Sequence, residues 1–457
     1  MTITHTETRT VSPLPVPNAF ARYESGVRSY CRSFPRTFAR AEGAHLFDRD
    51  DQAFLDFLCG CSTLNYGHNH PVLKRALIEY LERDGVTCGL DMFTDAKEAF
   101  LRTLNQVILK PRNMTYLAQF TGPTGTNAVE AALKLARKVT GRQNVIAFTN
   151  GFHGVSLGAL AATGNGHHRM DGTLVLSGVT RMPFDGYLGP DVDTADYLDA
   201  VLEDPSSGVD KPAAILLETV QGEGGLNVAG PGWLKRVEAI ARKHGALLIV
   251  DDIQAGCGRT GTFFSFEHAG IQPDLITLAK SLSGLGLPLS LVLIRPDLDV
   301  WSPGEHNGTF RGNCHAFVTA TAALNHFWRD NELTARIAAR GAQLRAGLAE
   351  IAIAHGLDPR QAIKGRGMML GLSLPQEAAS SATTGQLTRA AFARRLLIET
   401  SGPYDEVVKV LAPLTISGDE LADGLSRLSQ AAAEAFAARG GDASGTRNRA
   451  KPGAGVR

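Results

Sequence analysis

Cysteine is scarce in this chain, and long apolar runs and an excess of either charge are absent. Six cysteines occur among 457 residues, and none forms a C-x-x-C pair, which argues against a disulfide framework and a zinc site. We expect reduced thiols in a cytoplasmic protein. No apolar run approaches the roughly 18 residues of a membrane span, and residues 1–15 lack the features of a signal peptide.

The charge balance excludes two classes of partner. Lys+Arg and Asp+Glu both number 46, so we expect no binding to nucleic acid or to an anionic membrane surface. The chain is 44% hydrophobic and 20% charged, which is typical of a soluble globular protein with a large core. Its length indicates more than one folding unit, because domains average about 150 residues.

The two ends differ from the body of the chain. Residues 1–20 are polar and contain three prolines, which predicts a flexible arm, and the Gly/Ala/Arg-rich segment 438–457 predicts a disordered tail. Between them, apolar runs alternate with helical patterns, as in an α/β protein with a parallel sheet. The candidate strands are 144–149, 213–219, 246–252, 274–279 and 289–294.

The pattern changes from residue 316 onward. We expect helices over 317–328 and 333–355 and around 390–399, with a short apolar segment at 368–374. This part of the chain therefore predicts a smaller α+β domain appended to the sheet domain.

Two strings carry most of the chemical information. GALLIVDDIQAGCGRTG (245–261) places Asp251, and PDLITLAKSLSGLGLP (273–288) places Lys280, at the carboxyl end of an apolar run. A strand-end aspartate often only caps the next turn, but an unpaired lysine avoids burial. An amine withdrawn from water is a nucleophile that can form an imine. With a carboxylate to hold a ring nitrogen protonated, it meets the needs of pyridoxal 5'-phosphate.

A phosphate site is indicated by TGPTGTNAVEAALKLARK (121–138), a Gly/Thr-rich turn that leads into a helix. Free amides at a helix N-terminus suit a phosphate dianion. Gly125 allows close approach of the anion, and the Thr126 hydroxyl can donate to it. The alternative interpretation is an ordinary N-cap at Thr126 or Asn127.

Three further segments follow strands or lie in loops. Phe152 in GFHG can stack on a planar ring, although an aromatic there more often joins the core. Glu218 and Glu223 follow another strand and are interpreted as site residues, with a solvated loop as the alternative. The sequence of the loop around Thr309 does not by itself indicate a function.

The signature from Asp251 to Gly261, with Lys280 at the matching spacing, resembles the class-III aminotransferases that use pyridoxal 5'-phosphate, over residues 20–435. The resemblance implies fold type I, with a large domain (66–315) built on a mainly parallel seven-stranded sheet. A smaller α+β domain would combine the N-terminal segment 21–65 with residues 316–437.

The resemblance also implies residue roles. The cofactor contacts it implies are Gly125, Thr126, Phe152, Glu218, Asp251, Gln254, Lys280 and Thr309. Lys280 would bind the cofactor covalently, and Asp251 would pair with its pyridine nitrogen, so these two would be catalytic. Thr309 would reach the phosphate of a neighbouring subunit, which implies a homodimer or higher oligomer with shared active sites.

Within this family, several segments are similar to the subgroup that forms 2,4-diaminobutyrate from glutamate and aspartate semialdehyde in ectoine biosynthesis. They include 28–38, 64–77, 304–313 and 399–416. Two alternatives within pyridoxal phosphate chemistry stay open: an ω-aminotransferase of the 4-aminobutyrate or ornithine type, and an aminomutase. A cofactor-free scaffold is a third alternative, which the intact Asp251 and Lys280 disfavour.

One position departs from the ornithine and 4-aminobutyrate relatives, which have arginine where this chain has Lys409. Lysine is a point charge without the bidentate geometry of arginine, so the way a substrate carboxylate is held differs here. We hypothesise that Lys409 pairs with Glu223 and that both lie at the substrate site.

Overall fold

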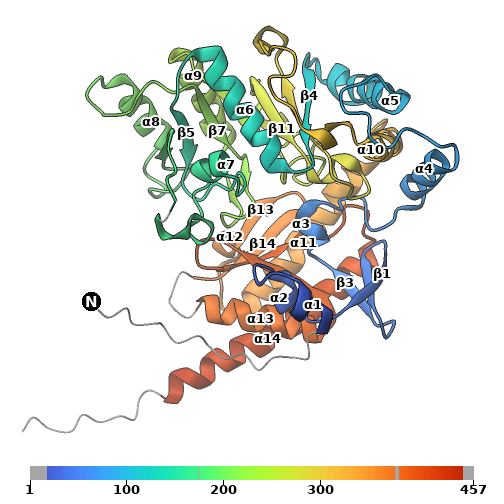
Figure 1. Ribbon diagram of the computed structural model, residues 1–457. Coiled ribbons are helices and arrows are strands. Elements are labelled where there is room, and N and C mark those ends of the chain that lie inside the picture. The colour runs from blue at the N-terminus through green and yellow to red at the C-terminus, as the bar shows by residue number, and fades with distance from the viewer. Residues whose placement is uncertain (1–17, 173, 376–379, 446–457) are drawn as a thin grey trace, which may run out of the picture.

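The computed structural model describes residues 18–172, 174–375 and 380–445. Its largest element is a seven-stranded sheet (Figure 1). In spatial order the strands are β4 (Leu117–Gly122), β12 (Ser290–Ile294), β11 (Leu275–Leu278), β10 (Leu247–Asp251), β7 (Ala214–Leu217), β5 (Val145–Phe148) and β6 (Val179–Met182). Only β12 runs against its neighbours, so the expected mainly parallel seven-stranded sheet is confirmed.

Both faces of this sheet are buried, as the continuous apolar runs predicted. Along β10, Leu248 and Val250 point into one core, while Leu247 and Ile249 point into the other. The amphipathic helix α6 (Gly125–Thr140) covers the second face, and α9 (Pro231–Lys243) and α10 (Cys314–Phe327) cover the first. Other helices of this part are α4 (Pro71–Glu82), α5 (Asp95–Thr103), α7 (Leu157–Ala162) and α8 (Thr194–Glu203).

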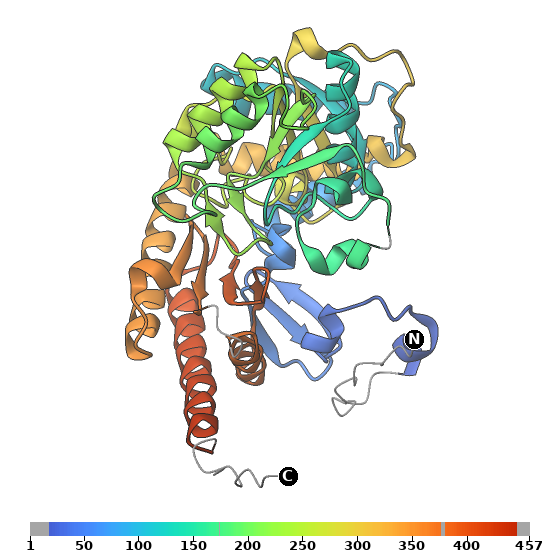
Figure 2. The same cartoon turned by 90° about the vertical axis from the view of Figure 1, so that its left-hand side faces the viewer.

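The rest of the chain forms two four-stranded sheets with helices beside them. One contains β1 (Phe38–Glu42), β2 (His45–Asp48), β3 (Ala53–Asp56) and β15 (Leu396–Leu397), so N-terminal and C-terminal segments share a sheet. The other contains β13 (Ile363–Arg366), β14 (Met369–Ser373), β17 (Val407–Val410) and β16 (Glu399–Ser401). Figure 2 shows the blue N-terminal strands beside the orange and red C-terminal elements, below the large sheet.

The C-terminal helices are α11 (Glu332–Ala354), α13 (Ser380–Ala393) and α14 (Gly418–Gly445). The expectation of helix around 390–399 was wrong beyond residue 393. Arg395 adopts a left-handed conformation (φ 59°) that ends the helical path, and Leu396–Leu397 then pairs with β3. Helix α14 enters the segment expected to be a tail, while residues 1–17 and 446–457 lie outside the described residues.

Within the described ranges, we find no helix with the length and apolar character needed to span a membrane.

Candidate active site

Five mutually parallel strands of the large sheet bring sequence-predicted residues to one edge. Gly125 follows β4, Phe152 follows β5, Glu218 follows β7, Asp251 ends β10 and Lys280 follows β11. Because the carboxyl ends of parallel strands share an edge, residues up to 155 positions apart meet there. The clustering that the sequence predicted is therefore present.

Asp251 is buried, and both of its carboxylate oxygens have hydrogen-bond partners. Its Oδ1 accepts hydrogen bonds from Thr277 Oγ1 at 3.0 Å and from the Ile253 amide at 3.2 Å. Its Oδ2 lies 2.8 Å from Nδ1 of His153, a buried residue that sequence reasoning quoted within GFHG but did not select. The carboxylate is thereby fixed in orientation at the strand end, as a partner for a ring nitrogen must be.

Lys280 opens a short 3-10 turn (Lys280–Ser283) and has a left-handed backbone, with φ of 48°. A non-glycine residue in this region is uncommon and often marks a functional site. Its side chain is half-buried, and within the described ranges its Nζ has no hydrogen bond or ion pair. The amine is available for reaction.

The turn before α6 has the features of a phosphate cradle. Thr124, not Thr126 or Asn127, is the N-cap, and it forms a capping box with Asn127. The Thr126 hydroxyl lies 2.6 Å from Ser156 Oγ, at the start of α7. A Cβ added to Gly125 would lie 2.9 Å from Ile253 Cδ1, so glycine keeps the turn against the strand-end loop.

Phe152 and Glu218 are held together across the sheet edge. Glu218 accepts hydrogen bonds from the amides of Phe152 at 2.9 Å and Gly222 at 3.2 Å. Burial, together with the nearby charge of Asp251, raises the pKa of Glu218 to about 7. The Phe152 ring is half-buried and meets His168 edge-on, so it is not sealed in the core.

A polar chain leads away from this edge. Gln254 Nε2 donates to Glu223 Oε1 at 2.9 Å, and the same oxygen lies 2.9 Å from Lys409 Nζ, so the predicted Glu223–Lys409 pair is confirmed as a contact. Lys409 Nζ also lies 3.1 Å from Oε1 of Glu399. The sequence analysis did not select Glu399, the first residue of the segment 399–416.

The residues fit the implied cofactor. Gln254 Oε1 is buried without a hydrogen-bond partner in the described chain, an acceptor that a ring hydroxyl would satisfy. This acceptor, the unpaired amine of Lys280 and the oriented carboxylate of Asp251 are the groups that could bind a pyridoxal ring. The Gly125–Thr126 turn supplies the amides and the hydroxyl for a phosphate.

Thr309 follows Gly308, where an added Cβ would lie 2.7 Å from the carbonyl oxygen of Thr121 on β4. It is exposed in a 3-10 turn (Thr309–Gly312) and accepts a weak hydrogen bond from Cys88 Sγ through its carbonyl. Its role toward a neighbouring subunit stays a prediction.

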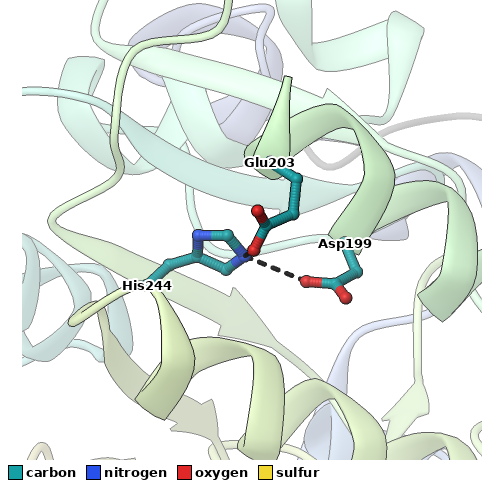
Figure 3. Close-up of side chains that lie close together, drawn as sticks. All are labelled: Asp199, Glu203 and His244. Atoms are coloured by element: carbon teal, nitrogen blue, oxygen red, sulfur yellow. Dashed lines mark hydrogen bonds and ion pairs between the residues drawn. The ribbon is translucent and has the colours of Figure 1, made fainter. Parts of the chain in front are cut away.

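A second cluster of titratable groups lies near the opposite ends of the strands. Asp199, Glu203 and His244 approach one another between α8 and α9 (Figure 3). Lys243 Nζ lies 2.9 Å from Asp199 and 2.7 Å from Glu203, so these carboxylates already have a cationic partner. Within the described ranges this is the one grouping with metal-ligand geometry, and His244 precedes the strand that Asp251 ends.

Comparison with known proteins agrees with this geometry. The family model described as aminotransferase class III matches residues 28–432. Diaminobutyrate–2-oxoglutarate transaminase of Vibrio cholerae is 57% identical over 407 residues (89% of this chain, 97% of the relative), and that of Streptomyces anulatus is 53% identical over 425 residues (93% and 99%). The ornithine aminotransferase structure from Toxoplasma gondii, with pyridoxal phosphate at partial occupancy, matches with a TM-score of 0.77 at 28% identity over 93% of this chain and 94% of that one.

Proposed function

The chain belongs to the class-III aminotransferases and uses pyridoxal 5'-phosphate, and we propose that it transfers the amino group of L-glutamate to L-aspartate 4-semialdehyde. The products are 2-oxoglutarate and L-2,4-diaminobutyrate. The observation that carries the proposal is the sheet edge, where the oriented carboxylate of Asp251 ends β10 and Lys280, with its unpaired amine, follows the adjacent parallel strand β11. The substrate assignment is supported by relatives named diaminobutyrate–2-oxoglutarate transaminase at more than 50% identity over nearly their whole length.

The cofactor, when bound, supplies a ring that accepts the electrons left on the substrate carbon when its proton is removed. Lys280 would hold the cofactor and would then act as general base and acid at that carbon. Asp251 would keep a proton on the ring nitrogen, with His153 keeping Asp251 in place. Gly125 and Thr126 would hold the phosphate.

We also propose that the enzyme is a homodimer or a higher oligomer with shared sites. Three apolar side chains near Thr309 support this, because Phe93, Met92 and Phe310 are exposed by 102%, 56% and 65%. An ion pair between Arg311 and Asp91 joins their two segments. A second subunit covering this surface would bring Thr309 to its partner's phosphate.

The domain boundaries are part of the proposal. A small domain made of 21–65 and 316–437 is supported by the pairing of β3 with β15, which joins Leu55 to Leu396. The large domain is 66–315. We further propose a cytoplasmic location, with the product feeding ectoine biosynthesis.

Coupled turnover tests the proposal. Glutamate with aspartate semialdehyde should turn over faster than glutamate with succinate semialdehyde or glutamate semialdehyde. An aminomutase would release no 2-oxoglutarate from glutamate, and a scaffold would show no visible cofactor band. Borohydride reduction followed by peptide mass spectrometry should place the cofactor on Lys280. Labelling at another lysine, or a visible band that glutamate leaves unchanged, would contradict the assignment.

A further inference from the structure

Lys409 is not available as a simple clamp for a substrate carboxylate. It lies on β17 directly opposite Glu399 on β16, in an antiparallel pair. Its Nζ lies 3.1 Å from Glu399 and 2.9 Å from Glu223, so one ammonium serves two carboxylates. Within the described ranges, neither glutamate has an ion pair to any other cation.

The exposed part of this cluster is acidic. The Lys409 side chain is completely buried, whereas Glu223 keeps 27% and Glu399 keeps 11% of its side-chain surface exposed. A molecule that reaches the cluster therefore meets the glutamate side chains and not the ammonium. The three side chains carry a formal charge of −1 when both glutamates are ionised.

Neighbouring groups act differently on the two glutamates, because burial and the charge of Glu223 raise the pKa of Glu399. Burial opposes ionisation of Glu223, but the charges of Lys409 and Lys280 outweigh it and lower the pKa of Glu223 to about 2. Tyr30 donates a hydrogen bond of 3.2 Å to Glu399 Oε2, and burial beside Glu399 raises the pKa of Tyr30, so the hydroxyl keeps its proton. The cluster is tied to the cofactor edge by Gln254, which donates to Glu223.

We infer that Glu399, with Glu223, acts in the half-reaction that interconverts aspartate semialdehyde and diaminobutyrate, where it selects substrates that carry an ammonium group at the end remote from the reacting carbon. This inference rests on the proposed function, which places the reacting carbon at Lys280. L-2,4-Diaminobutyrate reacts through its 4-amino group and has an α-ammonium at the other end, as has aspartate semialdehyde. 4-Aminobutyrate has the same carbon chain and carboxylate but lacks that ammonium. Glu399 is thus a specificity-determining residue toward the α-amino acid end of the substrate.

The comparison of these two donors is the test. The wild-type holoenzyme, with 2-oxoglutarate as acceptor, should show kcat/KM at least about tenfold higher for diaminobutyrate than for 4-aminobutyrate. Glu399→Gln should reduce this ratio about tenfold, through a loss on diaminobutyrate. Titration of the visible cofactor band with each donor alone should show the same change in apparent Kd.

Two control variants make the result decisive. Glu399→Asp keeps the charge and should keep most of the preference, and Glu350→Gln, an exposed residue on α11, changes the net charge equally and should leave the ratio unaltered. An unchanged ratio in Glu399→Gln with an intact cofactor band overturns the inference alone. A wild-type enzyme that uses neither donor overturns the proposed function instead.

Discussion

His153 Nδ1 lies 2.8 Å from Asp251 Oδ2, and the two side chains are only 1% and 4% exposed. Burial alone would lower the pKa of His153, but the hydrogen bond and charge of Asp251 outweigh it and raise that pKa. The imidazole is therefore a donor to Asp251. Because Thr277 holds the other oxygen, the carboxylate cannot rotate away from the sheet edge.

We expect His153→Gln to lower kcat about tenfold to a hundredfold, since a buried hydrogen bond to a charged group is worth about 1.5–3 kcal/mol. Steady-state kinetics at saturating cofactor measure this. His355→Gln removes an imidazole from the small domain and should leave kcat unchanged. A wild-type value of kcat in His153→Gln would show that Asp251 does not need the hydrogen bond from His153.

Much of the sheet could be predicted because its signals are local. Runs such as 246–250 are continuous and apolar, as strands buried on both faces require. Asp251 and Lys280 end such runs, so their shared edge follows from parallel pairing alone. The same reasoning predicted the cradle at Gly125, because a glycine-rich turn before a helix has a local signature.

The rest depends on contacts between distant segments. Glu399 lies opposite Lys409 because of the register of two paired strands, and the sequence of one strand alone does not determine that register. Leu396–Leu397 follows a helical pattern but pairs with β3, more than 300 residues earlier, so tertiary pairing overrode local propensity. His153 follows a strand in a loop, and its role depends on a contact with Asp251, which lies 98 residues later in the chain.

Asp252 differs from its neighbour Asp251 and should report on stability. It is buried, and burial raises its pKa to about 7 although Ser265 donates hydrogen bonds to it. The folded pKa exceeds the unfolded value of 3.8, so its stabilising effect is present below pH 3.8 and is lost as pH rises toward 7. We expect the free energy of unfolding of wild type relative to Asp252→Asn to fall over this range, by up to about 1.4 kcal/mol per pH unit.

Denaturant unfolding of the cofactor-free protein between pH 4 and 8 measures this difference. Asp84→Asn, at an exposed position, should follow wild type at every pH. Parallel curves for wild type and Asp252→Asn would mean that Asp252 is ionised throughout.

Arg259 should be a major source of stability, although it has no ion pair to a carboxylate within the described ranges. Its side chain is fully buried and donates to the Met368 and Ala412 carbonyls and to Asn65 Oδ1. We expect Arg259→Lys to lower the free energy of unfolding by about 2–4 kcal/mol, because lysine lacks the planar fork and leaves buried acceptors unpaired. Arg345 is exposed and donates to one carbonyl, so Arg345→Lys should lower the free energy of unfolding far less. Equal losses would show that the buried fork is not needed.

Substitution of Thr126 distinguishes the contribution of its hydroxyl to phosphate binding from that of the backbone amides. Ser156 Oγ donates to Glu130 Oε1 at 2.5 Å, so in the 2.6 Å contact between the two hydroxyls Thr126 is the donor. A phosphate dianion is a stronger acceptor than Ser156 Oγ, so the Thr126 hydroxyl would donate its hydrogen bond to the phosphate instead.

We expect Thr126→Val to raise the Kd for pyridoxal 5'-phosphate about tenfold or more, with kcat at saturating cofactor changed by less than about twofold. Thr126→Ser keeps the hydroxyl and should bind nearly as wild type does, in absorbance titrations of cofactor-free protein. If Thr126→Val binds as tightly as wild type, the amides of the turn hold the phosphate alone.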